Sequence, residues 1–454
     1  MNASNESKSV RQLASEILFK VDCQSAYADI LLDRTLKATP LDERDRALLT
    51  ELTYGTLRWR GKIDARLSEQ VRRPLANTDA FVRNLLRATV YQLFFLDKIP
   101  DYAAVNEAVA LAKTRRGGKT AGFVNGVLRN LLRRKQVGLK PQSTDESTAA
   151  LATELSHPEW LVQRWIKEFG RREACALMHA NNQRAPLVLR ANRLKCSRDE
   201  LLARWRANGI AASPAPWAPQ GISVESGGNV ENLPGFAEGM FQVQGEASQL
   251  VAYLLAPSPD ERILDACAAP GGKSCQIAEL MDDSGELIAL DKSTRGVERI
   301  RQNITRLNLH SIRTVQADAT KEFSSELSVP YDRILVDAPC SGLGTLRGHP
   351  EIKWQRREND ILRLNELQLK IVNHVAGYLK PGGVLVYSTC TLTRDENEQL
   401  VGAFLAQHKE FVLEDAARYL PEPARRMVRD DFFQALPHRD QTDGFFAARM
   451  RKVS

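Results

Sequence analysis

Two cysteines in the C-terminal half of the chain combine a nucleophilic side chain with a position just past a predicted buried strand. Cys340 lies in the run Asp337 to Gly342, and Cys390 lies in the run Tyr387 to Thr391. A thiolate that adds to C6 of a cytosine makes the neighbouring C5 reactive, and a second cysteine can help to undo the adduct. Taken alone, either cysteine is more often a small buried apolar side chain. The pair indicates covalent chemistry on a pyrimidine if other elements bring a cofactor to it.

A turn of small residues upstream supplies the features of a nucleotide-type cofactor loop. The predicted strand 262–266 breaks into the run Cys267 to Gly272, and a helix follows. Glycines let the backbone approach a ligand closely, and a helix start offers unpaired N–H groups. A second apolar run, 287–290, ends in Asp291 about 20 residues after the glycines, which is the spacing expected of a ribose-binding carboxylate.

This segment matches two phosphate-binding motifs only in part. Gly272-Lys273-Ser274 resembles the end of a P-loop, yet the glycine that should precede it by five positions is replaced by Cys267. The dinucleotide fingerprint Gly-x-Gly-x-x-Gly is also absent, so no cradle for a pyrophosphate is evident. A cofactor that contains adenosine but no phosphate fits better, and S-adenosylmethionine carries the methyl group that an activated C5 would attack. A P-loop NTPase is retained as an alternative.

The C-terminal half alternates apolar strands with amphipathic helices, which predicts a mostly parallel sheet covered on both faces. The expected strands are 262–266, 286–291, 311–317, 332–337, 383–389, 411–414 and 444–451. Helices are expected at 293–307, 357–379 and 394–407, and Pro381-Gly382-Gly383 is expected to be a turn. Open α/β sheets bind ligands at the carboxyl ends of their strands. The residues expected at such ends are Asp265, Asp291, Asp318, Asp337 and Cys390.

Three of these runs resemble the signature motifs of the RNA 5-methylcytosine methyltransferases. They are Asp265 to Lys273, Asp337 to Gly342 and Ser388 to Thr391. Within that family the chain is most similar to the branch that acts on small-subunit ribosomal RNA. This similarity draws on the runs 181–186, 349–354 and 443–446, and on an N-terminal helical domain similar to the transcription factor NusB.

The resemblance implies a fold, a cofactor and roles for individual residues. The implied fold class is α/β, with a Rossmann-like methyltransferase domain preceded by an all-helical NusB-like domain and a small α+β module. Cys390 would be the nucleophile and Cys340 would assist release. The residues implied to contact or border S-adenosylmethionine are Cys267, Ala268, Ala269, Pro270, Gly271, Gly272, Lys273, Asp291, Asp318 and Asp337.

The implied reaction also needs charge control around the base. A free thiol is only a few per cent ionised at neutral pH, and Lys273 is a candidate source of the positive field that a thiolate requires. Asp337 would meet N3 and the exocyclic amine of cytosine, and as a protonated acid it would need a pKa raised by burial. Cys340, or a water that it orients, would take the C5 proton. Transfer RNA as the substrate and a non-catalytic RNA-binding or assembly role are the alternatives.

Composition frames these expectations. The chain has 454 residues, 43% of them apolar, which is enough for about three domains with their own cores. Residues 1–20 contain no apolar signal core, so we expect neither secretion nor membrane insertion. Seven cysteines without Cys-x-x-Cys spacing favour a reducing cytoplasm, and seven scattered histidines give no reason to expect a metal. We expect a cytoplasmic monomer.

Basic charge is concentrated in the first 140 residues, which contain 25 Lys and Arg against 15 Asp and Glu, a net of +10, while the remainder carries −3. Helices are expected there at 81–97, 103–113 and 121–135. Seven basic residues cluster late in this part: Arg115, Arg116, Lys119, Arg129, Arg133, Arg134 and Lys135. A solvated helix face would explain any one of them, but together they suit the phosphate backbone of an RNA. The family resemblance implies that this RNA is small-subunit ribosomal RNA.

The expected domains are 1–140, 151–240 and 241–454, with a linker at 137–149. The middle module is expected to mix helices at 158–169, 171–180 and 197–208 with strands at 186–191 and 221–225. Two further groups are candidates for RNA contact. Asn181, Asn182 and Arg184 either touch RNA or cap a helix, and the basic and aromatic loop after Cys340, including Lys353 and Trp354, either holds a strand or packs as an ordinary loop.

Overall fold

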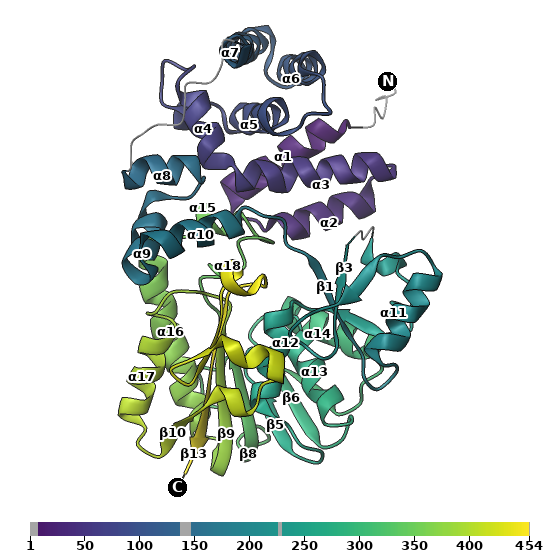
Figure 1. Ribbon diagram of the computed structural model, residues 1–454, viewed down its shortest axis with the longest axis vertical. Helices are drawn as coiled ribbons and strands as arrows, with labels where there is room; N and C mark the ends of the chain where they lie inside the picture. Colours follow the sequence, from purple (N-terminus) through teal and green to yellow (C-terminus); the bar gives the residue numbers. More distant parts are fainter. Residues whose placement is uncertain (1–7, 137–146, 226–228, 454) are drawn as a thin grey trace. The chain divides into compact units, whose positions relative to one another are not determined.

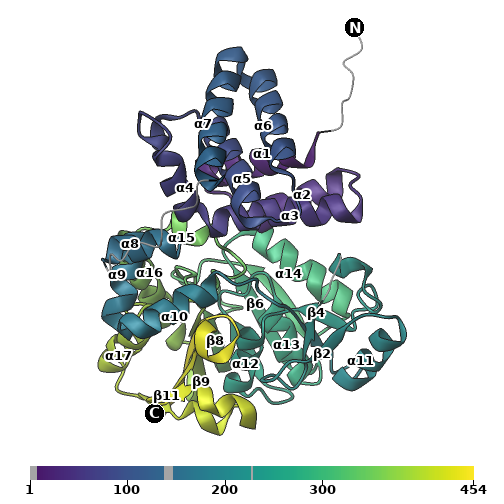
Figure 2. The same cartoon turned by 45° about the horizontal axis from the view of Figure 1, so that its top comes forward.

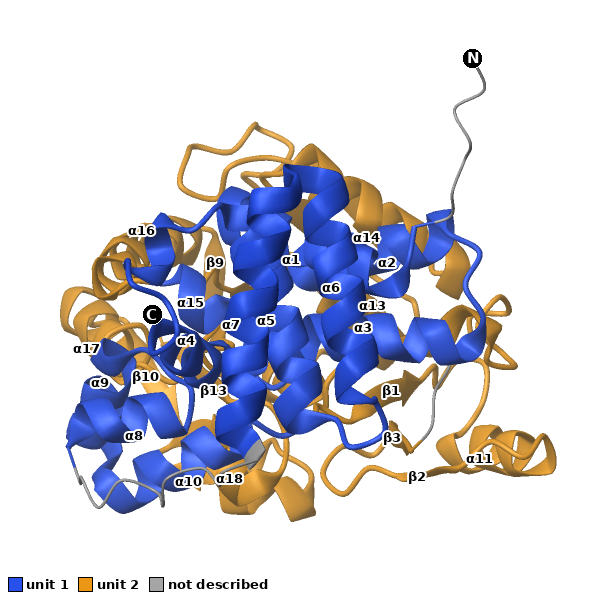
Figure 3. Ribbon diagram, turned by 90° about the horizontal axis from the view of Figure 1, so that it is seen from above, with its two compact units in different colours: residues 1–183, 346–356 blue, residues 184–345, 357–454 orange. Residues whose placement is uncertain are grey.

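The computed structural model describes residues 8–136, 147–225 and 229–453, and the chain divides into two compact units (Figure 3). Unit 1 comprises Met1–Gln183 together with Leu346–Arg356, and unit 2 comprises Arg184–Thr345 and Arg357–Ser454. The expected linker lies mostly outside the described residues, since only its last three positions, 147–149, are described. The domain limits 1–140, 151–240 and 241–454 stay a prediction.

Unit 1 is helical, and the three helices expected at 81–97, 103–113 and 121–135 are confirmed. Its core joins apolar residues of α1 through α7, among them Leu18, Leu49, Leu86 and Leu128. Figure 2 shows α6 and α7 side by side, and they carry the clustered basic residues. The helices are α1 (Val10–Gln24), α2 (Ala28–Ala38), α3 (Glu43–Arg58), α4 (Arg60–Ser68), α5 (Ala80–Phe95), α6 (Asp101–Arg116), α7 (Gly118–Gln136), α8 (Thr148–Glu154), α9 (Glu159–Phe169), α10 (Arg171–Asn181) and the short α15 (Ile352–Gln355).

Unit 2 begins with a small antiparallel sheet of order β2-β3-β1-β4. Helix α11 packs on it through Trp205, which contacts Phe241 edge to face. The expected strands 186–191 and 221–225 are confirmed, whereas the three-residue strands at its edges were too short to be recognised from the sequence. The elements are β1 (Leu187–Ala191), α11 (Arg198–Ala207), β2 (Ala212–Pro214), β3 (Gly221–Val224) and β4 (Phe241–Val243).

The large sheet of unit 2 has the order β11-β12-β13-β9-β8-β5-β6-β7, with β10 paired to β13. Strands β9, β8, β5, β6 and β7 are parallel, and β13 joins β9 antiparallel. The expected parallel core is thus present and is extended by antiparallel strands at one edge (Figure 1). The strands are β5 (Arg262–Asp265), β6 (Glu286–Asp291), β7 (Ile312–Gln316), β8 (Tyr331–Asp337), β9 (Leu379–Thr389), β10 (Phe411–Glu414), β11 (Val428–Arg429), β12 (Phe432–Ala435) and β13 (Phe445–Lys452).

Helices cover both faces of this sheet. Successive residues of a strand point to opposite faces, so alternate residues pack against different helices. Ile263 and Val386 pack with α12, α13 and α14, whereas Leu264 and Leu385 pack with α16 and α17. Strands β5, β6, β8 and β9 are therefore buried on both sides, as their apolar runs predict, whereas the edge strand β7 has no fully buried residue. The helices are α12 (Glu246–Leu255), α13 (Gly272–Leu280), α14 (Thr294–Leu307), α16 (Glu358–Ala376), α17 (Glu398–Gln407) and the short α18 (Pro437–Asp440).

Two expected boundaries are wrong. The sequence predicts a turn at 381–383 that precedes the strand, but β9 already starts at Leu379 and absorbs the glycines as an irregularity, with Gly382 at φ +77°. Helix α17 starts at Glu398 rather than at 394, because Glu396 and Asn397 are used in side-chain contacts before the helix begins. Among the described residues, no helix combines the length and apolar character needed to cross a membrane.

Candidate active site

The predicted site residues gather at the carboxyl edge of the parallel core of unit 2. Asp265, Asp291 and Asp337 are the last residues of β5, β6 and β8, and Cys390 directly follows β9. Asp318 lies two residues after β7. Hydrogen bonds connect the loops from neighbouring strands, for example the Ala338 N–H to the Ser388 carbonyl at 2.9 Å. The prediction that these strand ends meet at one edge is therefore confirmed.

The loop between β5 and α13 has the open backbone that a close-fitting ligand needs. Gly271 adopts φ +100°, which a side chain would strain, and a Cβ there would lie 3.2 Å from the backbone of Ile300. Helix α13 begins at the next residue, Gly272, so its first N–H groups lie at this loop. The predicted cofactor residues Cys267, Ala268, Ala269 and Pro270 form the preceding turn.

Two carboxylates border this loop. Asp291 accepts the Ala269 N–H through Oδ2 at 3.2 Å and the Ser293 N–H through Oδ1 at 2.8 Å, and a carboxylate has acceptor capacity left for ribose hydroxyls. Asp318 accepts the Lys292 ammonium at 2.9 Å and both donors of Thr320, and these hydrogen bonds hold its pKa well below the usual range. A glycine loop, a helix start and two acidic side chains fit an adenosine cofactor with a positively charged sulfonium.

Gly296 in α14 is a site residue that the sequence analysis missed. A Cβ at this position would lie 2.6 Å from Oδ1 of Asp291, so only glycine leaves that carboxylate in place. We expect Gly296→Ala to weaken S-adenosylmethionine binding at least about tenfold, although alanine favours a helix by about 1 kcal/mol. Isothermal titration calorimetry measures the affinity.

Gly402→Ala in α17 is the matched control, because a Cβ there meets nothing within 4 Å. Its affinity for S-adenosylmethionine should equal that of the wild type. Equal affinities for all three proteins would show that Asp291 does not need its present position.

Lys273 and Asp337, two predicted catalytic residues, contact each other. The Lys273 ammonium donates to Oδ2 of Asp337 at 2.7 Å and lies 4.8 Å from the Phe445 ring centroid, while Ser388 Oγ donates to Oδ1 of Asp337 at 2.9 Å. Lys273 is thus bound to Asp337, and its predicted effect on Cys390 stays a prediction, as does the proton on Asp337.

Asp265 is fully buried next to this pair. Its Oδ2 accepts the Ser274 hydroxyl at 2.7 Å, while Oδ1 has no hydrogen-bond partner in the described part of the chain. Burial, with a smaller effect of the nearby Asp337, raises the pKa of Asp265 to about 7. Asp265 therefore carries a proton in the folded protein below neutral pH.

This raised pKa predicts a pH dependence of stability. An unfolded aspartate releases its proton near pH 3.9, so between about pH 4 and 7 the folded state binds more protons, and its stability falls as pH rises. The contribution, of the order of 4 kcal/mol, is fully lost above pH 7. We expect Asp265→Asn to remove it, so that urea unfolding of the variant loses less stability than the wild type over this range. Parallel stability curves for the two proteins would contradict this assignment.

The two cysteine sulfurs lie next to each other. Sγ of Cys340 is 3.1 Å from Sγ of Cys390, and both side chains are half-buried. The hydrogen bond to Cys390, followed by burial, raises the pKa of the Cys340 thiol well above its usual range. Cys340 therefore remains a thiol and can donate to the Cys390 sulfur. Contacts also hold the loop Gly342 to Thr345: the Gly344 N–H donates to the Cys390 carbonyl at 3.0 Å, and Gly344 packs against Gly444.

Two residues of the basic and aromatic loop after Cys340 pack inside unit 1, and RNA contact by the rest of this loop stays a prediction. Lys353 is 1% exposed within unit 1, where its ammonium donates to the Arg58 carbonyl at 2.9 Å and to Asn182 Oδ1 at 3.3 Å. Trp354 Nε1 donates to the Leu57 carbonyl at 2.7 Å. Asn182 is itself buried at the end of α10, so its helix-end role is the one the structure supports.

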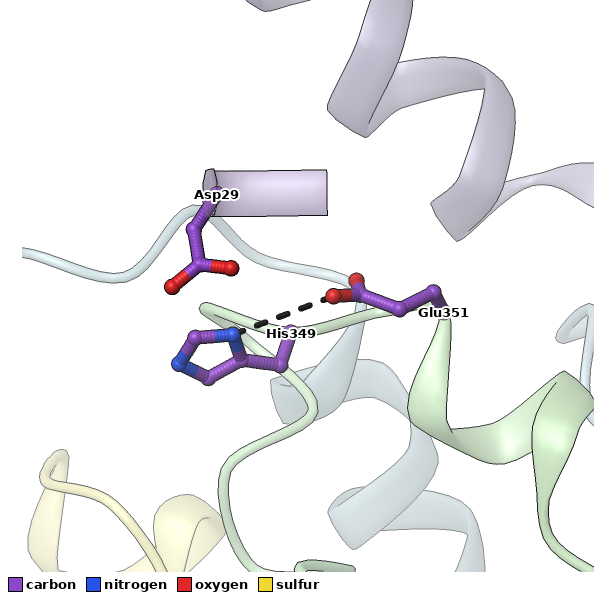
Figure 4. A group of neighbouring side chains, drawn as sticks. All are labelled: Asp29, His349 and Glu351. Carbon is purple, nitrogen blue, oxygen red and sulfur yellow. Dashed lines mark ion pairs between the residues drawn. The ribbon is translucent and has the colours of Figure 1, made fainter. Parts of the chain in front are cut away.

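One group in unit 1 has the residue types of a metal site. Ligand atoms of Asp29, His349 and Glu351 lie within 4.8 Å of one another (Figure 4). Glu351 already has a structural role, because its Oε1 accepts the Ala28 N–H at the start of α2 at 3.1 Å. Burial raises the pKa of Glu351, which disfavours its charged form. The absence of a metal site stays a prediction.

Comparison with known proteins agrees with this architecture. Residues 8–133 match the NusB family, 157–231 match the ferredoxin-like domain of RsmF/B-like methyltransferases, and 252–451 match the 16S rRNA methyltransferase RsmB/F family. The probable ribosomal RNA small subunit methyltransferase B of Bacillus subtilis is 40% identical over 98% of this chain and 99% of its own length.

Solved structures extend the comparison. The crystal structure of PH0851 has a TM-score of 0.84 at 26% identity and covers 98% of this chain and 99% of its own. NSun6 from Pyrococcus horikoshii, solved with the S-adenosylmethionine analogue SFG, has a TM-score of 0.58 at 26% identity and covers 65% of this chain and 98% of its own. The chain belongs to the RsmB/F family of 16S rRNA methyltransferases, enzymes that transfer a methyl group from S-adenosylmethionine to RNA.

Proposed function

We propose that this RNA methyltransferase methylates C5 of one cytosine in 16S ribosomal RNA through a covalent bond between Cys390 and C6. The observation that supports the proposal most directly is the 3.1 Å distance between the Cys340 and Cys390 sulfurs at the carboxyl edge of the sheet. Two thiols so placed can divide attack and release between them. The cytosine must be unpaired or flipped out of its helix to reach them.

The cofactor site would be formed by the β5–α13 loop and the acids that border it. The residues proposed to contact or border S-adenosylmethionine are Cys267, Ala268, Ala269, Pro270, Gly271, Gly272, Lys273, Asp291, Asp318 and Asp337. Bound S-adenosylmethionine supplies the methyl group that C5 takes up. Lys273 would hold Asp337 at the site. The 2.7 Å distance between the Lys273 ammonium and Oδ2 of Asp337 supports this role.

The proposed reaction assigns one step to each cysteine. The Cys390 thiolate, stabilised by the hydrogen bond from the Cys340 thiol, forms a bond to C6, and the ring electrons move toward C5 and N3. Asp337 faces N3 and the exocyclic amine. After methylation of C5, the C5 proton passes to a water that Cys340 orients, because the Cys340 thiol already holds a proton. The released electron pair restores the C5–C6 double bond and expels Cys390.

Methyl transfer to defined RNAs tests the substrate. Labelled S-adenosylmethionine is incubated with the wild-type protein and either 16S ribosomal RNA or transfer RNA, and bisulfite sequencing locates the product. We expect 5-methylcytosine at a single position of the ribosomal RNA. Modification of transfer RNA alone would replace the proposed substrate, and methylation at an atom other than C5 would overturn the proposed chemistry.

Unit 1 is proposed to bind the RNA backbone through exposed basic residues of α6 and α7. All seven predicted residues are exposed, and four of them pair with acids: Arg115 with Glu16, Arg116 with Asp79, Arg134 with Glu69 and Lys135 with Asp101. Exposed pairs contribute about 0–1 kcal/mol, so they can open for phosphates at little cost.

A double variant measures this contribution. We expect Arg129→Ala with Arg133→Ala to weaken RNA binding and to reduce the slope of log K against log salt by about 1 for each lost phosphate contact. Fluorescence anisotropy with a labelled RNA fragment at several salt concentrations gives both quantities. Lys37→Ala, which removes an exposed cation of α2, is the control, and a slope unchanged in the double variant would exclude α7 from the interface.

A further inference from the structure

Beneath the two cysteines, a buried polar network joins the loop that follows β8 to the loop that follows β9. Its centre is Glu396, which is 0% exposed. Through Oε1, Glu396 accepts the Ser341 N–H at 2.8 Å and Gln368 Nε2 at 2.9 Å. Through Oε2, it accepts the hydroxyls of Ser341 at 2.5 Å and Thr393 at 2.7 Å. One side chain thus satisfies four donors, and two of them belong to the residue after Cys340.

The neighbouring Asn397 holds the other cysteine from both sides. Thr389 Oγ1 donates to Asn397 Oδ1 at 2.6 Å, and Asn397 Nδ2 donates to the Thr391 carbonyl at 3.1 Å. Thr389 and Thr391 flank Cys390 in the chain. The network closes across the two loops, because the hydroxyls of Ser341 and Thr391 lie 2.6 Å apart.

The backbone of this segment is fixed as well. The Tyr387 hydroxyl, fully buried in β9, donates to the Glu396 carbonyl at 2.6 Å. Both oxygens of the Glu396 carboxyl are satisfied, whereas Oε1 of Gln368 has no hydrogen-bond partner in the described part of the chain. Loss of one partner in a buried polar network is costly. Tyr387 of β9 therefore fixes the backbone of Glu396, and the Glu396 side chain binds the loops that follow β8 and β9.

We infer that Glu396, with Asn397, is a positioning residue that sets the distance between the Cys340 and Cys390 sulfurs. This inference rests on the covalent roles proposed for the two cysteines. Glu396 itself is not a catalytic residue, because its carboxyl is fully used by Ser341, Gln368 and Thr393 and has no exposed surface. A misplacement of about 1 Å at a reacting atom can cost about 10²-fold in rate.

Glutamine at position 396 keeps the shape of the network and removes the charge. Its Oε1 still accepts from Ser341 and Gln368, while its amide donates to the hydroxyls of Ser341 and Thr393, which can rotate to accept. Alanine removes all four acceptor contacts and leaves the buried Ser341 N–H without its partner. The pair of variants therefore separates geometry from charge.

The experiment compares kcat, KM for RNA, S-adenosylmethionine affinity and the denaturant-resistant protein–RNA adduct among these variants. We expect Glu396→Ala to lower kcat about 100-fold with KM and cofactor affinity within threefold of the wild type, and Glu396→Gln to retain kcat within about tenfold. Glu398→Gln is the matched control, since this carboxyl accepts from Gln434 Nε2 at 2.7 Å, outside the network around Glu396. The kcat of Glu398→Gln should equal that of the wild type.

Two results would overturn the inference. One is a Glu396→Ala enzyme that keeps wild-type kcat, and the other is a Glu396→Gln enzyme as slow as the alanine variant, which would assign the effect to charge. If Glu396→Ala fails to bind the cofactor, Asn397→Ala replaces it, and wild-type turnover by that variant would likewise overturn the inference. Absence of an adduct in the wild type would instead refute the proposed covalent mechanism.

Discussion

Cys390→Ala is expected to abolish methyl transfer, with a loss of more than about 10⁴-fold in kcat, and to form no denaturant-resistant adduct with 16S ribosomal RNA. The reason is that C5 of cytosine gains nucleophilic character only after a thiolate adds to C6, and Cys390 is the residue proposed to form that bond. Cys340→Ala is expected to keep the first bond-forming step and to lose release, so that the adduct accumulates.

Gel electrophoresis under denaturing conditions, with labelled RNA and S-adenosylmethionine, separates the two outcomes. Cys196→Ala is a suitable control. This half-buried cysteine lies in the small-sheet part of unit 2, where its thiol donates to the Met240 carbonyl. Methyl transfer by Cys390→Ala would make Cys390 a structural residue. An adduct in Cys390→Ala but not in Cys340→Ala would exchange the roles of the two sulfurs.

The second large effect is expected at Arg190, a fully buried cation of β1. Its guanidinium binds both oxygens of Glu279, at 2.6 and 3.3 Å, donates to the Gln244 side chain, and donates to the Gly272 carbonyl at 2.9 Å. Arg190→Met leaves the charge of Glu279 buried without its partner. We expect the free energy of unfolding to fall by about 3–5 kcal/mol.

The contact with Gly272 adds an effect on the cofactor, because Gly272 starts the helix at the proposed cofactor loop. A double variant, Arg190→Met with Glu279→Met, removes both buried charges and should recover most of the lost stability. It should not recover S-adenosylmethionine affinity, which we expect to stay about tenfold below the wild type. Urea unfolding and calorimetry measure the two quantities.

Arg193→Ala provides the control for this pair. Arg193 also contacts this region, through the Glu279 carbonyl and Asp282, but its side chain is exposed, so the expected loss of stability is below about 1 kcal/mol. If the double variant regains cofactor affinity together with stability, Arg190 acts on the cofactor loop only through the fold.

The parts of the site that were predictable from the sequence are those with a local signal. Asp265, Asp291 and Asp337 each end an apolar run, and the carboxyl ends of parallel strands meet at one edge, so their convergence follows from the pattern. The open backbone at Gly271 likewise follows from the glycines.

The residues that escaped prediction depend on contacts between distant segments. Gly296 matters only because Asp291 lies against it, and Glu396 looks like a solvated acid in the run Arg394 to Glu398 until β8 and α16 bring Ser341 and Gln368 to it. For Lys353 the sequence left two roles open. A lysine in a polar loop is normally exposed, and nothing local reveals that Arg58 and Asn182 bury it.

The segment Leu346–Arg356 has a consequence for the order in which the protein is made. This stretch is encoded within the methyltransferase half, yet it belongs to unit 1, where Glu351 caps α2 and Lys353 and Trp354 bind the end of α3. Unit 1 is therefore complete only after the ribosome has synthesised residue 356. While the intervening 162 residues, from Arg184 to Thr345, are synthesised, the Leu57 and Arg58 carbonyls lack their hydrogen bonds from Trp354 and Lys353. An isolated fragment that ends at Gln183 lacks these two hydrogen bonds permanently.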